Sequence, residues 1–160
     1  MNKTFTGFAI ASFLVYGFVL YFMLFNLPGR AMVLVSDGMM ENYNYFNSIN
    51  LIPFMTIIEY ITGIGDASIR GHAIRNLGGN LFLLFPMGFY LPFLMDKLKE
   101  MKPYLLVVAV FIIIIEATQI LTLTGSMDID DFILNFSGAL LGYAFFKHTP
   151  FCSIFKYRAW

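Results

Sequence analysis

The sequence has little charge and almost no cysteine. Only 12% of its 160 residues are charged, whereas a soluble domain carries about 25%. The ten basic residues balance the ten acidic ones, so no basic excess is present to attract nucleic acid. The single cysteine, Cys152, excludes a disulfide framework within one chain and a cysteine-rich metal site. A secreted disulfide scaffold is therefore ruled out.

Apolar side chains dominate the rest of the chain. Hydrophobic residues make up 59% and aromatic residues 18% of the sequence, and the mean hydropathy is +0.74. A soluble domain of this length could not bury so much apolar surface. The composition excludes a disordered chain and an ordinary cytosolic enzyme. It predicts an all-α integral membrane protein, with residues 1–160 forming one membrane domain.

Four apolar stretches are long enough to span a membrane, which takes about 20 residues of helix. Each holds at most two charged residues, and the stretches are residues 6–27, 77–95, 104–124 and 129–146. The first is longer than the apolar region of a signal peptide, and no cleavage site follows it. We therefore expect four transmembrane helices, the first of them an uncleaved anchor.

The loop between the first two spans contains one more helix-like segment. Residues 51–62 read LIPFMTIIEYIT, a run too short to cross a membrane. Asn50 suits a helix N-cap, Pro53 suits a first turn and Gly63 suits a helix end. The sequence predicts a short interfacial or re-entrant helix that partly covers the outer end of the bundle.

Basic residues predict the orientation of the chain, because they are retained on the cytoplasmic side. Most of them fall in three segments that the four spans place on one side, namely Lys3, then Lys97, Lys99 and Lys102, then Lys147, Lys156 and Arg158. The turn between the third and fourth spans has none, and the long loop 28–76 has only three. Both termini are predicted to be cytoplasmic and loop 28–76 to lie outside the cell.

Polar side chains gather in the outer third of three predicted spans, whereas the inner halves have almost none. A charge near mid-membrane costs about 2.5–3.5 kcal/mol on insertion scales, so it is expected to face a partner or water. Glu116 lies eight residues before Thr124, about 12 Å below the outer edge of the membrane. The sequence therefore predicts an outward-facing polar cavity. Its candidate ligand-binding residues are Arg75, Asn76, Asn80, Gln119, Asp128, Asp130 and Asn135.

The fourth span carries a single stripe of polar and small residues. Asp131, Asn135, Gly138 and Gly142 recur at helical spacing and share one face. We expect Asp131 and Asn135 to line the cavity. The two glycines, four residues apart, favour close helix packing.

Structural roles compete with ligand binding for several candidates. The asparagines of the second span can simply hydrogen-bond neighbouring helices. Asp128 and Asp130 can cap the fourth span, where negative charge at a helix N-terminus is favourable. Glu116 can form a buried ion pair with Arg75 that locks the bundle. The sequence leaves these alternatives open.

Five motifs occur in an order and spacing typical of one known family. They are Asn50-Leu-Ile-Pro-Phe54, Asn76-x-x-Gly-Asn80, Phe85-Pro-x-Gly88-x-x-Leu-Pro92, Ile115-Glu116-x-x-Gln119 and Asp128-Ile-Asp130-Asp131-x-Ile-Leu-Asn135-x-x-Gly-x-x-x-Gly142. Over residues 50–145 the chain resembles the VanZ-like family of bacterial membrane proteins. The resemblance implies a multi-pass protein of the bacterial cytoplasmic membrane that acts in the cell envelope. It also implies a link to low-level resistance to teicoplanin-type glycopeptide antibiotics.

Three classes of function stay open. The first is a non-enzymatic envelope protein whose cavity binds an amphiphilic ligand, such as a lipid-linked cell-wall precursor or a lipoglycopeptide, and so lowers drug susceptibility. The second is an intramembrane enzyme acting on a lipid-linked envelope substrate, with Glu116 as general base and Asp131 as a second catalytic candidate. The third is an ion-coupled transporter with Glu116 as the proton relay, which at four spans would have to work as a homo-oligomer.

The expected partners are membrane lipids and the amphiphilic ligand, and no nucleic acid. No Walker loop, zinc signature or Ser-His-Asp set points to a cofactor. A divalent cation held by Asp130 and Asp131 is the one candidate. The resemblance to the VanZ-like family implies an arginine just before these aspartates, where this chain has Gly125-Ser126-Met127. If that arginine pairs with the carboxylates, Arg75 or a cation must replace it here.

Overall fold

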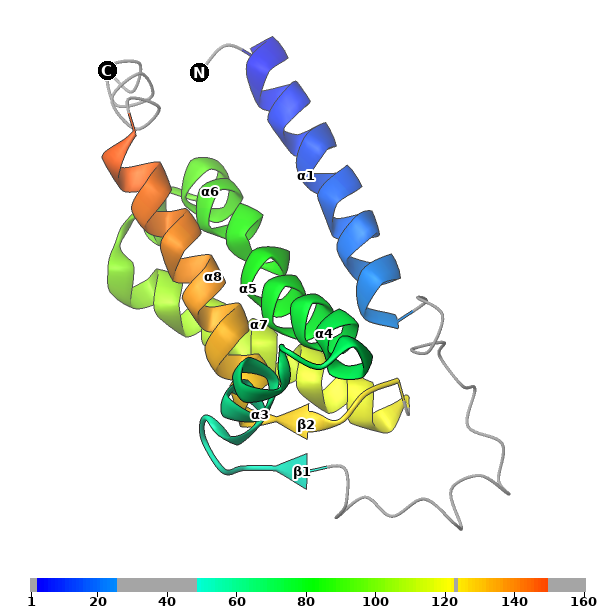
Figure 1. Cartoon of the computed structure of the whole chain (residues 1–160). Coiled ribbons are helices and arrows are strands. Elements are labelled where there is room, and N and C mark those ends of the chain that lie inside the picture. The colour runs from blue at the N-terminus through cyan, green and yellow to red at the C-terminus, as the bar shows by residue number, and fades with distance from the viewer. Residues whose placement is uncertain (1–2, 26–48, 123, 150–160) are drawn as a thin grey trace.

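The computed structural model describes residues 3–25, 49–122 and 124–149. Two predicted features, the basic tail residues Lys156 and Arg158 and the single Cys152, lie outside the described residues, as does Arg30. The elements in chain order (Figure 1) are α1 (Lys3–Phe25), β1 (Ile49–Asn50), α3 (Met55–Gly63), α4 (Ala67–Ala73), the π-helix η2 (Ile74–Gly78), α5 (Gly79–Leu83), α6 (Phe85–Leu94), the 3-10 helix η3 (Asp96–Lys99), α7 (Met101–Leu121), β2 (Met127–Asp128) and α8 (Ile129–His148).

Four helical stretches are long and apolar enough to cross a membrane. They are Thr6–Phe25, Ala67–Leu94, Met101–Leu121 and Ile129–His148. The prediction of an all-α membrane protein with four spanning helices and one short extra helix is confirmed. The short helix is α3, which has no buried residue and is too short to cross a membrane.

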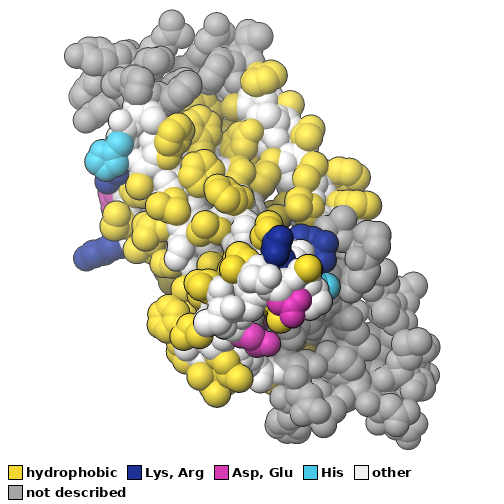
Figure 2. All heavy atoms as spheres, in the orientation of Figure 1, with side chains coloured by type: hydrophobic (Ala, Val, Ile, Leu, Met, Phe, Trp, Pro, Cys, Tyr) yellow, Lys and Arg dark blue, Asp and Glu magenta, His cyan; other side chains and the backbone are white. Residues whose placement is uncertain are grey.

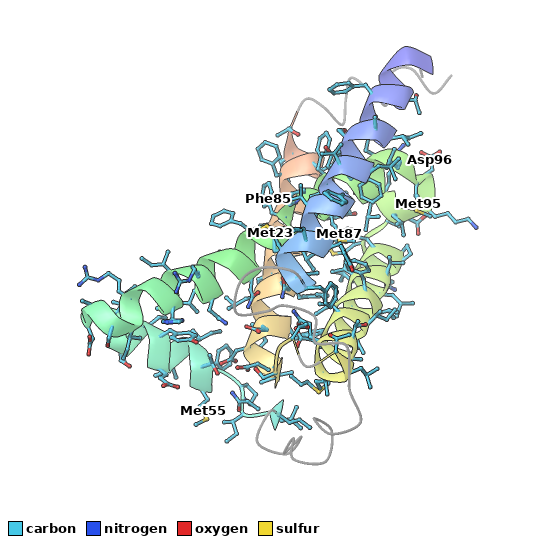
Figure 3. All side chains as sticks on the ribbon, turned by 90° about the vertical axis from the view of Figure 1, so that its right-hand side faces the viewer. Met23, Met55, Phe85, Met87, Met95 and Asp96 are labelled. Carbon is cyan, nitrogen blue, oxygen red and sulfur yellow. The ribbon has the colours of Figure 1, made fainter. Side chains whose placement is uncertain are left out.

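The second span starts ten residues earlier than the predicted residue 77. Asp66 caps it, with its side chain accepting a hydrogen bond from the Ser68 N–H at 2.8 Å. A helix from residue 67 to 94 is about 42 Å long, which exceeds the ~30 Å hydrocarbon core of a bilayer. α4 therefore extends beyond the hydrocarbon core of the membrane. Its sequence need not be apolar there, so hydropathy alone did not predict it as part of the second span. In Figure 3, α3 and α4 project together to one side of the bundle.

This long helix is broken twice, and the second break fixes α1 to the bundle. The backbone passes through the π turn η2 and breaks again at Leu84, just before Pro86. Met87 N–H then bonds to the Leu84 carbonyl at 3.0 Å, so the Leu83 carbonyl needs a donor from outside the helix. The Tyr16 hydroxyl of α1 supplies it at 2.8 Å.

The centre of the bundle is the contact between α5–α6 and α8, which run side by side in Figure 1. A Cβ atom added at Gly138 would lie 1.8 Å from the Leu81 carbonyl oxygen, and one at Gly142 would lie 2.0 Å from that of Phe85. The backbones thus approach too closely for any side chain at these positions. The close packing expected of the two glycines is present.

α7 packs against the other side of α8 through tyrosines. The Tyr104 hydroxyl donates to the Ala139 carbonyl at 2.7 Å, and the Tyr104 and Tyr143 rings stack with centroids 4.4 Å apart. The Tyr143 hydroxyl in turn donates to the Lys99 carbonyl at 2.6 Å. Fully buried aromatic rings therefore join the start of α7 to the last turns of α8.

The two ends of the bundle differ in charge. α1 begins and α8 ends at one end, whereas β1, β2 and α3 lie at the other, which we call the loop end (Figure 1). Lys147 extends over the Tyr143 ring and so lies with Lys99 away from the loop end. Figure 2 shows apolar side chains over most of the described surface, with the few charged side chains in two separate groups. This pattern is the one expected of a protein that crosses a bilayer.

Candidate functional site

The loop end is held together by a short parallel pairing of distant segments. Ile49 pairs with Met127 and Asn50 with Asp128, which brings the residues before α3 beside the start of α8. Strands of two residues leave no alternating pattern in a sequence. Sequence analysis missed this pairing for that reason.

Asp130 holds α3 in place. Its carboxylate is fully buried and accepts hydrogen bonds from the backbone N–H groups of Phe54 at 2.6 Å and Ile57 at 3.0 Å. Those groups belong to the start of α3, where no residue of the same helix can satisfy them. α8 therefore caps α3 through Asp130. The expectation that Asn50 caps this helix is wrong, because its side chain accepts from the Ile52 N–H instead.

Asp128 connects β1, α3 and α8. It caps its own helix by accepting from the Asp130 N–H at 2.9 Å. It also accepts from the Thr56 hydroxyl at 2.6 Å and from the Asn50 side-chain amide at 3.3 Å. Of the two aspartates, Asp128 thus caps the fourth span, as the sequence allowed, whereas Asp130 caps α3 instead.

The divalent cation predicted at Asp130 and Asp131 finds no ready ligand set. Within residues 49–122 and 124–149, no three His, Cys, Asp or Glu side chains are grouped to hold a metal ion. Each carboxylate oxygen of Asp130 already faces a backbone N–H donor. The cation stays a prediction, and Asp130 is poorly suited to bind it.

Deeper in the bundle, α5 and α8 share a second polar cluster. The Asn80 side-chain amide donates to an Asp131 carboxylate oxygen, and that of Asn135 donates to the Asp131 carbonyl at 2.9 Å. Asn80 and Asn135 are 5% and 4% exposed. The Oδ1 atoms of Asn135 and Asn76 are buried and accept no hydrogen bond from any described residue. The cluster therefore has acceptor capacity to spare.

Glu116 and Gln119 enter from α7. Glu116 is 3% exposed and lies five residues before the end of α7, about 8 Å from that end. Gln119 donates to the Leu24 carbonyl of α1 at 3.4 Å. α7 thus carries an acid and an amide to the same end of the bundle as Asn80 and Asp131.

Glu116 lines a cavity together with Asp128. The cavity holds about 200 Å³, and its other walls are apolar side chains from α7, the start of α8 and the segments beside them, namely Leu51, Ile113, Met127, Ile129 and Phe132. The structure therefore places two residues with buried carboxylates, Glu116 of α7 and Asp128 at the start of α8, beside one mostly apolar space. A carboxylate there can bind a hydrogen-bond donor or exchange a proton with a guest.

Arg75 does not join these residues. Its side chain is exposed, and its guanidinium lies 3.8 Å from the position a Cβ would take at Gly71. This position does not support the buried ion pair with Glu116. Among the described residues, the buried side chains with polar groups are acids, amides, the Thr124 hydroxyl and the tyrosines of α7 and α8, with no lysine or arginine.

The comparisons with known proteins agree with the motif order. A family model described as VanZ/LLP1 matches residues 10–155. That range includes every candidate site residue and most of each spanning helix. No curated protein and no solved structure matches the chain.

Proposed function

Because the chain belongs to the VanZ/LLP1 family and has four helices able to span a membrane, we propose that it lowers susceptibility to teicoplanin-type lipoglycopeptides. It does so in the cell envelope, by binding an amphiphilic or lipid-linked ligand at the loop end. Family membership supports the envelope setting. The buried polar cluster and the adjoining cavity support the binding role.

The observation that carries the proposal is the place of Glu116. A carboxylate is costly within a membrane span, and such a residue by default marks a binding or transport site. Glu116 lines a cavity about 200 Å³ in volume beside Asp128. Hydrophobic packing of α7 requires no acid at this depth, whereas a ligand with donor groups would make use of one.

The decisive test replaces the charge while keeping the shape. Glu116→Gln retains size and most hydrogen bonding but removes the charge, so we expect a normal protein level with lost protection in a teicoplanin susceptibility assay. Glu59→Gln makes the same chemical change on the exposed surface of α3 and should retain protection. Unchanged protection in Glu116→Gln would contradict the proposal. Loss of the protein itself would indicate that Glu116 is structural.

The orientation is proposed from the basic residues. Lys97, Lys99 and Lys147 are exposed and belong to η3 and the last turn of α8. The positive-inside rule then places that end in the cytoplasm and the loop end outside the cell. In a Cys152→Ser background, an impermeant maleimide applied to intact cells should label a cysteine at position 72 and spare one at position 99. The reverse result would overturn the orientation and the outward-facing site.

The cavity also favours a second candidate, an intramembrane enzyme with Glu116 as general base. A base must lie beside the space that its substrate occupies, and Glu116 does. Mass spectrometry separates the two candidates. A lipid-linked cell-wall precursor incubated with the purified protein should keep its mass if the protein only binds it, and should change mass if the protein is an enzyme.

A further inference from the structure

The first turn of α3 is bound to the start of α8 by three hydrogen bonds to carboxylates. The N–H groups of Phe54 and Ile57 donate to the two oxygens of Asp130, at 2.6 and 3.0 Å. The Thr56 hydroxyl donates to Oδ2 of Asp128 at 2.6 Å. The segment that leads into α3 thus supplies donors to two acids whose oxygens a ligand with donor groups could also use.

Asp128 connects this contact to the cavity. It lines the cavity together with Glu116, and Leu51, which leads from β1 towards α3, forms another part of the wall. The hydrogen bonds that Asp128 accepts from β1 and from α8 both go to Oδ1. Among the described residues, Oδ2 therefore accepts from Thr56 alone. A ligand donor that approaches Oδ2 competes with the Thr56 hydroxyl.

α3 gains little from apolar packing at this contact. None of its residues is buried, and apolar side chains such as Met55, Ile58 and Ile61 are exposed. In Figure 3, α3 leads away from the bundle from its first residue, Met55. Its far end packs against α4, where a Cβ atom added at Gly63 would lie 3.1 Å from the Ile69 side chain. Release of the first turn from α8 would therefore uncover little apolar surface.

The bound conformation is strained at Phe54. Its φ of 66° lies in the left-handed region, which is unfavourable for any L-residue that carries a Cβ atom. No other non-glycine residue in the described part of the chain has a positive φ. The Phe54 side chain is exposed, so packing does not impose this angle. The hydrogen bond from Phe54 to Asp130 holds a backbone conformation that the segment would otherwise leave.

We propose that the first turn of α3 occupies these carboxylates in place of a ligand, and that a ligand entering the cavity beside Glu116 displaces it from Asp128. The inference rests on the proposed function and adds how its site is opened. The donors displaced from the two acids are two N–H groups and one hydroxyl. The ligand therefore offers hydroxyl or amide donors, as the sugars and peptide bonds of a lipoglycopeptide do.

Hydrogen exchange measures the release of α3 directly. In purified full-length protein in phosphatidylcholine vesicles, Thr56→Val removes the hydroxyl bond to Asp128 and should speed up exchange of the residue 51–63 amides about tenfold. Thr62→Val is the matched control, because the Thr62 hydroxyl donates to carbonyls within α3. It should change this exchange by less than about twofold. Thr56→Ala removes the same hydroxyl and serves if the valine variant does not fold.

Relief of the strain should have the opposite effect. Phe54→Gly keeps the N–H donor and accepts the left-handed angle, so exchange of residues 51–63 should slow about threefold. Met55→Gly, one residue further along and inside the helix, should instead speed up this exchange, because glycine weakens a helix. Equal effects of the two glycine variants would overturn strain at Phe54 as a contribution to the release.

Teicoplanin is the probe for displacement. A saturating amount should speed up exchange of residues 51–63 in the wild type, because the bound ligand takes the place of the first turn of α3. When the state that binds is a minor one, the apparent affinity is proportional to its population. Thr56→Val should therefore bind teicoplanin more tightly by the factor that it adds to exchange, about tenfold. Thr62→Val should bind it as the wild type does.

Three results would overturn the displacement. They are equal exchange in the two threonine variants, a teicoplanin affinity that Thr56→Val leaves unchanged, and exchange of residues 51–63 that teicoplanin slows or leaves unchanged. Any of these together with lost protection in Glu116→Gln would reject the displacement and keep the proposed function. Retained protection in Glu116→Gln with faster exchange in Thr56→Val would reject the proposed function and keep the release of α3.

Discussion

The two halves of α8 contact their neighbours in opposite ways. From Gly138 onward the helix lies backbone to backbone against α5–α6, with Cβ positions at Gly138 and Gly142 only 1.8 and 2.0 Å from carbonyl oxygens. From Ile129 to Asn135 it meets its neighbours through the side-chain hydrogen bonds of Asp130 and Asp131, and the Asn135 Oδ1 is buried without a donor from the described residues. One half is filled completely, whereas the other keeps unused hydrogen-bonding capacity.

The half of α8 from Gly138 onward therefore has a packing role, whereas the half from Ile129 to Asn135 is suited to binding a ligand. A glycine interface gains its stability from dispersion and leaves no space. A buried acceptor without a donor costs about 1–3 kcal/mol, so it persists where a ligand or water satisfies it. The spare acceptors next to Asp131 are thus expected at a binding site and unexpected at a packing interface.

The largest effect is expected at the glycine interface. Gly138→Ala would place a methyl group 1.8 Å from the Leu81 carbonyl oxygen, and α5 and α8 would have to separate. We expect a loss of more than about 3 kcal/mol or no folded protein, measured by thermal unfolding in detergent. Gly78→Ala, where no atom lies within 4 Å, should change stability by less than about 1 kcal/mol. Equal stability of both variants would contradict the close packing.

A smaller and more local effect is expected at Asp130. Asp130→Ala leaves the Phe54 and Ile57 N–H groups without their acceptor, a loss of about 1–2 kcal/mol for a helix cap. Hydrogen exchange of the α3 amides should speed up while that of α7 and the second half of α8 stays unchanged. Asp66→Ala removes the cap of α4 in the same way and should affect the α4 amides only. Global destabilisation by Asp130→Ala would show that the loop end and the packed half are not separate.

A still smaller effect is expected from the tyrosine between α7 and α8. Tyr104→Phe removes the hydrogen bond to the Ala139 carbonyl and keeps the stacked ring. Hydrogen bonds within membrane bundles average ~0.6 kcal/mol, so the melting temperature should fall by only a few degrees. Protection against teicoplanin should be unaffected, because Tyr104 lies in the packed region. Lost protection at full protein level would place function outside the loop end.

Much of the fold could be predicted because the membrane limits what a chain can do. Long uncharged runs have to be helices there, so four spans and the uncovered short helix followed from hydropathy and length. The glycine spacing predicted close packing of the fourth span. The start of the second span was wrong by ten residues, because α4 extends past the hydrocarbon core and its start depends on a local cap at Asp66.

The candidate site was predictable as a group of residues and less so in its contacts. Depth along each helix put Asn80 at the level of Asp131, and these two side chains are hydrogen-bonded. Helical spacing predicts which side chains share a face, but it does not predict contacts with the backbone of another segment. The capping of α3 by Asp130 could therefore not be predicted from the sequence. Arg75 was expected in the cavity because it is near in sequence, yet it lies in the π turn η2 and its side chain is exposed.

The smallest effect is expected at Asp66, the exposed counterpart of the buried cap at Asp130. Hydrogen bonds from the Ser68 N–H and hydroxyl hold the pKa of Asp66 below its usual range. Because the folded pKa is lower than the unfolded one, the carboxylate stabilises α4 fully above the ordinary value of about 3.9. That stabilisation fades as pH falls through the folded pKa. Hydrogen exchange of the α4 amides should therefore speed up at acid pH in the wild type, whereas Asp66→Asn should remove this pH dependence.

Ser68→Ala provides the control, because it removes the hydroxyl donor and keeps the backbone one. The midpoint of the acid-induced change in α4 should then move to higher pH, toward the ordinary value for aspartate. An unchanged midpoint would mean that the Ser68 hydroxyl does not stabilise the charged form. Asp66 is fully exposed, so water competes for its carboxylate and the effect on overall stability should be slight. In the same exchange assay, Asp130→Ala should speed up exchange of the α3 amides by more than Asp66→Ala speeds up exchange of the α4 amides, because the Asp130 carboxylate is buried away from competing water.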